Sequence, residues 1–311
     1  ALRKVFPRYG VTAFLPSVPS LSCMEIENVA NDCLTAMRNA DPGANILGLF
    51  SEGVCVDPEK RGAQVQNAKT CPVEHFVEIL KRYADVFRIV TLAPENNECG
   101  TLLHACRKLG IIPSFGHSGA DYDQAVDAFN KGCYHVTHLY NAMGKLAEEK
   151  PDGSIFPGPV IAALLDDRVF TEIIVDGNHV HSAFVKVALR AKHPDKMILV
   201  TDSMRAAGMG FAGKMRFAGQ EVEVTSEVAL LDTGRPAASI ITLDRAIRNV
   251  MQWQATTLPQ AIKMATINPA TLLSLPSTGA LVPGYYADVV ALDTDLHVVA
   301  SWCRGVLMYC I

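Results

Sequence analysis

The chain has 311 residues and a formal net charge of −4, from 28 basic and 32 acidic side chains. No basic block stands out, so we do not expect a nucleic acid partner. Apolar residues make up 49% of the chain, enough for a large core in one barrel or two ordinary domains. No run of 18 uncharged apolar residues occurs, and residues 1–10 lack the apolar centre of a signal peptide. We therefore predict neither a membrane span nor a leader.

The nine cysteines are scattered along the chain, and none forms a CxxC pair. An odd number without regular spacing favours reduced thiols over a disulfide framework, and hence a cytoplasmic protein. A cysteine zinc site is not expected for the same reason.

Seven short apolar runs alternate with helix-length amphipathic segments. We expect strands at 11–16, 46–51, 89–93, 112–116, 134–138, 171–175 and 197–201. Helical patterns lie between them, for example at 71–85, 100–110, 121–132 and 181–192. Continuous apolar strands alternating with helices indicate a parallel sheet covered by helices. Seven such units in series favour a TIM-type (β/α)8 barrel over a doubly wound sheet.

The barrel needs eight strands, whereas residues 1–10 look like the end of a helix leading directly into the first strand found. We therefore expect the first strand to be missing, which would leave two unpaired edges. Residues 204–239 read as a loop with a short hairpin, followed by helices near 242–254 and 258–266. The alternating tail predicts a small β-module, so the expected domains are a 1–282 barrel and a 283–311 sandwich remnant.

Active groups of such barrels lie at the carboxyl ends of the strands. The ionisable and polar residues there are Glu52, Glu95, His117, His138, Asn141, Asp176, His179 and Asp202. Each alone has an ordinary explanation, as a turn carboxylate, a packed histidine or a helix cap. Together, Glu52, His117 and His138 offer one oxygen and two nitrogen ligands, a set suited to zinc or iron. We predict one divalent metal there, with zinc as the first candidate and iron or another divalent ion as alternatives. Strand alternation puts His135 on the face opposite to His138, so we expect His135 to point elsewhere.

Asp202 ends the last predicted strand, where a carboxylate serves either as a general base or as a helix cap. A bound metal lowers the pKa of its water. Asp202 would then take a proton from that water and pass it to the leaving amine. His179 would hold or polarise the substrate, although a histidine on a loop is the plainer interpretation.

Several sequence blocks resemble the N-acetylglucosamine-6-phosphate deacetylases of the amidohydrolase superfamily. They include residues 116–143, DGNHVH, ILVTDSM, MATINPA and PGYYADVVALD, in the family's order, within residues 9–293. The resemblance implies a TIM barrel with a small β-sandwich, and metal-dependent removal of acetate to leave glucosamine 6-phosphate. It also implies Glu52, His117 and His138 as metal ligands and Asp202 as the catalytic residue. The implied substrate contacts are Ala63, Gln64, Asn141, Ala142, His179, Ala237, Ala238 and Ser239.

The chain departs from the family at positions near the substrate. Gln64 stands where a histidine is expected, and ungapped counting puts Glu149, followed by Lys150, where an arginine holds the phosphate. We therefore expect weak binding of the phosphorylated sugar. Two alternatives stay open: an amidohydrolase with a different N-acyl substrate, and a truncated, non-catalytic relative. The expected partner is a small amino sugar phosphate, and a homodimer is left open.

Overall fold

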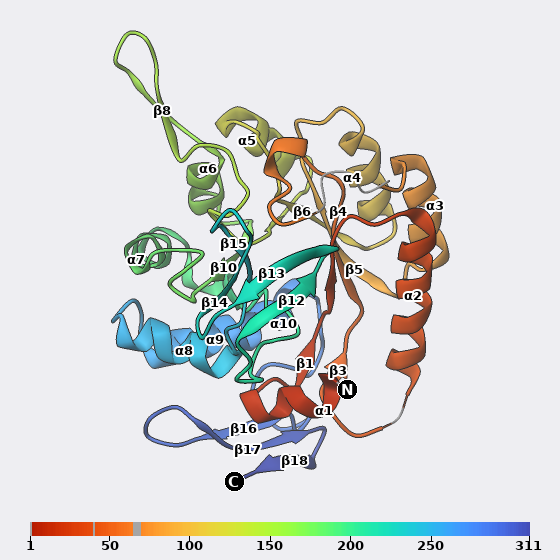
Figure 1. Cartoon of the computed structure of the whole chain (residues 1–311), viewed down its shortest axis with the longest axis vertical. Helices are drawn as coiled ribbons and strands as arrows, with labels where there is room; N and C mark the ends of the chain where they lie inside the picture. Colours follow the sequence, from red (N-terminus) through yellow and green to blue (C-terminus); the bar gives the residue numbers. More distant parts are fainter. Residues whose placement is uncertain (1, 40, 65–69) are drawn as a thin grey trace.

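The computed structural model describes residues 2–39, 41–64 and 70–311. A central parallel sheet is surrounded by helices, and both chain ends lie near one another below it (Figure 1). The strand order is β11-β10-β7-β6-β5-β4-β2, and every neighbouring pair is parallel. The strands are β2 (Ser17–Val18), β4 (Leu49–Cys55), β5 (Phe87–Leu92), β6 (Ile112–Phe115), β7 (His135–Val136), β10 (Phe170–Ile174) and β11 (Met197–Val200).

The prediction of seven parallel strands is therefore confirmed, although the first two are interrupted and β2 lies just beyond the predicted 11–16. β1 (Ala13–Phe14) pairs with β3 (Asn45–Ile46), apart from the pairing of β2 with β4. The interruption in the first strand falls at Pro16, which has no N–H to donate to a ladder. In the second it falls at Gly48, whose φ of 135° is open to glycine.

The helices that cover the sheet begin with local signals readable in the sequence. Ser22 and Glu25 form a reciprocal capping box at the start of α2 (Cys23–Arg38), and Asp121 and Gln124 do the same for α5 (Tyr122–Asn130). The other covering helices are α3 (Val73–Arg82), α4 (Cys99–Lys108), α6 (Pro159–Leu165), α7 (Ser182–Ala191), α8 (Leu243–Gln252) and α9 (Leu258–Ala265).

Apolar side chains fill both faces of the sheet. The larger cluster joins the outer face to the helices, with Phe76, Phe87, Phe115 and Phe129 fully buried. A smaller cluster on the inner face brings Phe50 and Ile89 against Leu273, just after α10 (Ile267–Leu272). The inner face is thus closed with apolar residues at one end, which leaves the other end for polar groups.

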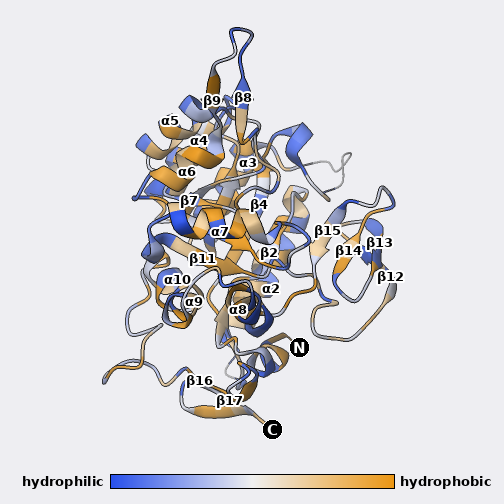
Figure 2. Cartoon of the chain, turned by 90° about the vertical axis from the view of Figure 1, so that its left-hand side faces the viewer, coloured by the Kyte–Doolittle hydropathy of each residue, from blue (hydrophilic) through white to orange (hydrophobic). Residues whose placement is uncertain are grey.

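Residues 204–239 hold more structure than the predicted loop with one short hairpin. They form a four-stranded antiparallel sheet from β12 (Gly213–Phe217), β13 (Gln220–Val224), β14 (Val228–Leu230) and β15 (Pro236–Ser239). A further hairpin, β8 (Ala147–Glu149) with β9 (Ile155–Pro157), was not predicted. It projects from the barrel with a hydrophilic tip (Figure 2).

The predicted β-module in the tail is a three-stranded antiparallel sheet. Its strands are β16 (Val289–Leu292), β17 (Val298–Cys303) and β18 (Val306–Cys310). The start of the chain packs against it: α1 (Leu2–Val5) leads into η1 (Phe6–Tyr9), and the Ser301 hydroxyl donates to the Pro7 carbonyl at 2.8 Å. Residues from the two ends of the chain therefore meet in this layer.

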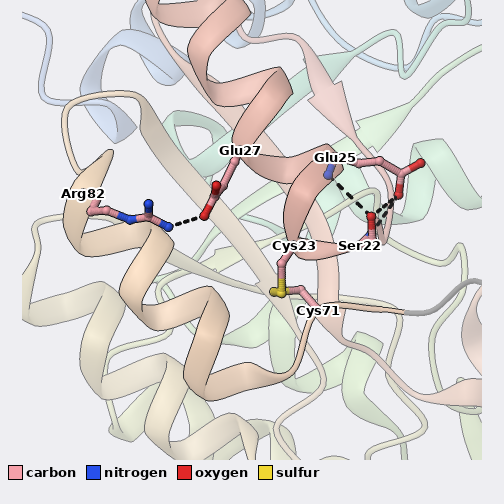
Figure 3. The surroundings of a disulfide bond; sticks show 6 residues. All are labelled: Ser22, Cys23, Glu25, Glu27, Cys71 and Arg82. Carbon is pink, nitrogen blue, oxygen red and sulfur yellow. Dashed lines mark hydrogen bonds and ion pairs between the residues drawn. A yellow bond between two sulfur atoms is a disulfide. The ribbon is translucent and has the colours of Figure 1, made fainter.

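The prediction of reduced thiols is wrong for four of the cysteines. Cys23 pairs with Cys71, and Cys55 pairs with Cys99. Figure 3 shows the first bridge joining the start of α2 to the segment before α3, beside an ion pair between Glu27 and Arg82. Sequence spacing could not reveal these pairs, because the partners lie 48 and 44 residues apart and meet only when the barrel forms. Because four cysteines are paired, reduced thiols no longer support the prediction of a cytoplasmic location.

Throughout the described ranges, no helix is both long and apolar enough to cross a membrane.

Candidate metal centre

Glu52, His117 and His138 converge at the carboxyl end of the sheet. Glu52 lies in β4, while His117 and His138 follow β6 and β7 by two residues each. The Nε2 atoms of the two histidines are 3.1 Å apart. Glu52 Oε2 lies 3.5 Å from Nε2 of His117 and 3.8 Å from Nε2 of His138. The histidines are buried, and one ligand atom from each of the three residues lies within 4.8 Å of the others.

This arrangement fits a divalent metal. Two bonds of about 2.1 Å at a tetrahedral angle place two histidine nitrogens about 3.4 Å apart, close to the separation seen. Lone pairs that face each other this closely, away from water, are stabilised by a cation between them. Two imidazoles with one carboxylate also form the donor set that zinc prefers in catalytic sites.

Hydrogen bonds orient two of the three groups. His117 Nδ1 lies 2.8 Å from the Lys60 carbonyl, which can only accept, so Nδ1 donates and Nε2 keeps its lone pair for a metal. The Gln64 amide donates to the Glu52 carbonyl at 2.9 Å and accepts from the Ser20 amide at 3.0 Å. By contrast, Nδ1 of His138 is buried without a hydrogen-bond partner.

Strained backbone aims these side chains. His117, His138, Ala142 and Asp202 all have positive φ, at 48°, 27°, 50° and 44°. Residues other than glycine adopt such angles only when the surrounding structure holds them, and they gather at functional sites. A strand ladder cannot continue through a left-handed residue, and β6, β7 and β11 each end two residues before His117, His138 and Asp202.

The charges of the centre act on one another. Burial works to raise the pKa of Glu52, but protonated imidazoles outweigh burial and lower it: His117 through a hydrogen bond and its charge, and His138 through its charge. Burial and the neighbouring His117 lower the pKa of His138. Burial, followed by the charge of Glu52, raises the pKa of Asp202 well above its ordinary value. Asp202 can thus hold a proton where Glu52 stays ionised.

A second polar group stands beside the centre. The Asp176 carboxylate accepts from His179 Nδ1 at 2.7 Å and from the Ser239 hydroxyl at 2.9 Å. Although burial opposes it, the hydrogen bond from His179 lowers the pKa of Asp176 to about 2. The Asn141 amide donates to the His179 carbonyl at 3.1 Å, and its Oδ1 is buried without a partner. His179, Asn141 and Ser239 therefore lie in one cluster, with His179 Nε2 left for a ligand.

The four-stranded sheet joins this cluster to the loop after β4. In β15, Ala237 is half-buried and Ala238 is buried. Ser239 forms a bridge with Ser203, next to Asp202. The Gln220 side chain donates to the Ala63 carbonyl at 2.7 Å.

Two sequence inferences need a different physical account. His135 does lie outside the cluster, as predicted, but not through alternation: β7 ends at Val136, and the backbone has turned before His138. Glu149 is exposed on the projecting hairpin, and Lys150 binds Glu148 at 2.7 Å. The place of Glu149 relative to the phosphate therefore stays a prediction.

Three contributors were not found from the sequence. The Lys60 carbonyl and Gln220 act through contacts that leave no local pattern. Glu172 is different: it is a buried acid inside the apolar run TEIIVDG, and its Oε2 accepts from the His138 amide at 3.4 Å. A charged residue within a buried strand was the signal that could have revealed it.

Comparison with known proteins defines the class. Residues 80–308 match the amidohydrolase family. The chain belongs to this family.

Within the family, the chain is similar to deacetylases of amino sugar phosphates. It is 35% identical to N-acetylglucosamine-6-phosphate deacetylase of Lysinibacillus sphaericus, over 92% of the chain and 73% of that protein. It is 31% identical to N-acetylgalactosamine-6-phosphate deacetylase of Escherichia coli O157:H7, over 96% and 78%. A variant N-acetylglucosamine-6-phosphate deacetylase from Mycobacterium smegmatis, solved in complex with N-acetylglucosamine 6-phosphate, aligns with a TM-score of 0.88 at 28% identity. That alignment covers 98% of the chain and 78% of the solved one.

Proposed function

We propose that the chain is a metal-dependent deacetylase that converts N-acetylglucosamine 6-phosphate into glucosamine 6-phosphate and acetate. The observation that carries the proposal is the convergence of Glu52, His117 and His138 at the end of the sheet. Relatives named for this activity support the substrate. One divalent metal would supply a polarised water and a Lewis acid at this point, and zinc is the metal that we propose first.

Asp202 carries the proton in this scheme. Its carboxylate takes a proton from the attacking water and delivers it to the amide nitrogen, so that the nitrogen leaves as an amine. Burial and nearby negative charge raise its pKa, which favours holding the proton between the two transfers. The strained φ of 44° fixes where the carboxyl group stands during both transfers.

His179 binds the substrate through Nε2, because Nδ1 is occupied by Asp176. Asn141, with a free buried Oδ1, and Ala142 form the adjoining wall. The remaining contacts that we propose are Ala63, Gln64, Ala237, Ala238 and Ser239. Gln64 acts through its backbone or by a shift of its side chain, since both of its amide atoms bind backbone groups.

Several finer statements belong to the proposal as well. The seven strands correspond to seven of the eight in a (β/α)8 barrel, and β16–β18 to one layer of a small sandwich, which divides the chain at 282/283. A homodimer stays open, and a cytoplasmic location stays a prediction that no longer rests on reduced thiols.

The test is acetate release by purified protein loaded with zinc, iron or manganese. We expect turnover of N-acetylglucosamine 6-phosphate, and a fall in kcat of about 10²–10⁴-fold in Asp202→Asn with metal content unchanged. Parallel assays use the unphosphorylated sugar and N-acetylgalactosamine 6-phosphate. Absence of acetate from the proposed substrate, in folded protein with one metal per chain, would contradict the assignment. Faster release of acetate from N-acetylgalactosamine 6-phosphate would assign the chain instead the activity for which the Escherichia coli O157:H7 relative is named.

A further inference from the structure

A layer of polar side chains lies beneath the metal centre, inside a face that is otherwise apolar. Thr91, Ser114, His135 and Thr137 are each at most 1% exposed, and Glu172 is 6% exposed. They come from β5, β6 and β10 and from β7 with the residue after it. Ser114 and His135 are register partners, so their side chains share one face of the sheet. Phe50, from the apolar inner cluster, packs its ring against His135.

Hydroxyl groups hold His135 in one orientation. The Thr91 and Thr137 hydroxyls are 2.9 Å apart, and those of Thr137 and Ser114 are 2.5 Å apart. The Ser114 hydroxyl lies 2.8 Å from His135 Nδ1. If each hydroxyl donates to the next, His135 Nδ1 accepts, and the ring carries its proton on Nε2. That nitrogen faces Glu172 Oε1 at 3.4 Å.

Glu172 spans the distance from this layer to the metal centre. One carboxylate oxygen faces His135, and the other accepts from the backbone amide of His138. A buried carboxylate is costly unless it is paired and hydrogen-bonded. The acid therefore needs an explanation beyond packing.

His138 is the histidine of the centre whose ring is not oriented by a hydrogen bond at Nδ1. His117 is oriented through its ring, by the Lys60 carbonyl. The ring of His138 has no partner at Nδ1, and its backbone is held in the left-handed region at φ 27°. Its carbonyl accepts from the Asn141 amide at 3.1 Å, and the following amide, of Leu139, donates to the Glu172 carbonyl at 2.8 Å. The Glu172 carboxylate adds the side-chain contact to this support, through the His138 amide.

We propose that Glu172, which faces His135, is a positioning residue for His138 and thereby sets the affinity of the centre for its metal. The proposal rests on the metal site of the proposed function, but on neither the substrate nor the reaction. Groups that orient metal ligands contribute about 10- to 100-fold in metal affinity. Glu172 also places a negative charge beside the site, which adds to the attraction for a cation.

The test is the dissociation constant of Zn²⁺, measured on metal-free protein by competition with a chromophoric chelator. We expect Glu172→Gln to weaken zinc binding about 10- to 100-fold. We also expect it to change the visible spectrum of the Co²⁺-loaded protein, because His138 would sit differently. Asp244→Asn is the matched control: this buried acid on α8 pairs with Arg248, outside the polar layer. It should lower Tm and leave zinc affinity within threefold of wild type.

A second pair of variants covers the other partner and the case in which Glu172→Gln fails to fold. Glu172→Asp keeps the charge but withdraws the carboxylate from the His138 amide, so affinity should fall here too. His135→Asn combined with Glu172→Gln should weaken zinc binding no more than Glu172→Gln alone, since both act through one contact. Zinc affinity within threefold of wild type in folded Glu172→Gln or Glu172→Asp would overturn the proposal. Because no substrate is used, an absence of deacetylation would leave this result unaffected.

Discussion

Removal of the two histidines of the centre should abolish the response of the protein to metal. We consider His117→Ala, His138→Ala and the double variant, each compared with wild type before and after a chelator. The three ligand groups lie on three different strands or strand ends, so a metal held between them links β4, β6 and β7 in the folded state only. Metal that binds the folded state alone must stabilise it.

The size of the effect follows from linkage. At a free metal concentration 1,000 times Kd, binding adds about 4 kcal/mol to the free energy of unfolding. An unfolding entropy of about 2.1 cal/mol/K per residue turns this into a Tm shift of about 6 °C for a chain of this length. Wild type should lose that much on chelation. The double variant, left with Glu52 alone, should show no shift.

The assay is thermal unfolding, with metal content measured by mass spectrometry on the same samples. His75→Ala, an exposed histidine on α3, controls for the loss of a histidine as such, and it should keep both metal and shift. The site reasoning fails if the folded double variant still holds one metal per chain and still loses about 6 °C on chelation.

Three further outcomes are expected. In metal-free protein, Asp202→Asn should have a higher free energy of unfolding than wild type at pH 8 but not at pH 4. Chemical denaturation at both pH values measures this difference. A carboxyl group whose pKa is raised by burial and by Glu52 costs stability once pH exceeds its unfolded value; an equal difference at both pH values would disprove this. Gln64→Leu should lower stability by about 2–4 kcal/mol, because it leaves two backbone groups without partners; an unchanged denaturation midpoint would show that these bonds contribute nothing. Thiol titration of denatured, unreduced protein should find five free cysteines, and reduction should lower the free energy of unfolding by about 4 kcal/mol per bridge; nine free thiols would exclude both bridges.

The sequence by itself determined the parallel sheet and the helices that cover it. Each strand is a short apolar run, and each covering helix is an amphipathic segment. Such periodicity can be read from the sequence without knowing any contact. It also determined which residues approach the centre. His117 and Asp202 stand just past the ends of β6 and β11, and Glu52 lies within β4. The carboxyl ends of parallel strands meet at one edge of the sheet whatever the details of packing.

Tertiary structure alone decided how those residues are held. Alternation along the expected strand did not predict the direction of the His138 side chain. The strand ends at Val136, and the left-handed backbone of His138 sets that direction instead. The pairing of the cysteines, the support of His117 by the Lys60 carbonyl and the buried Glu172 beneath His138 all join distant segments. A sequence records the type of each side chain and its neighbours along the chain. These contacts depend on which distant segments lie side by side, and that is settled only when the strands pair into the sheet and the helices pack on it.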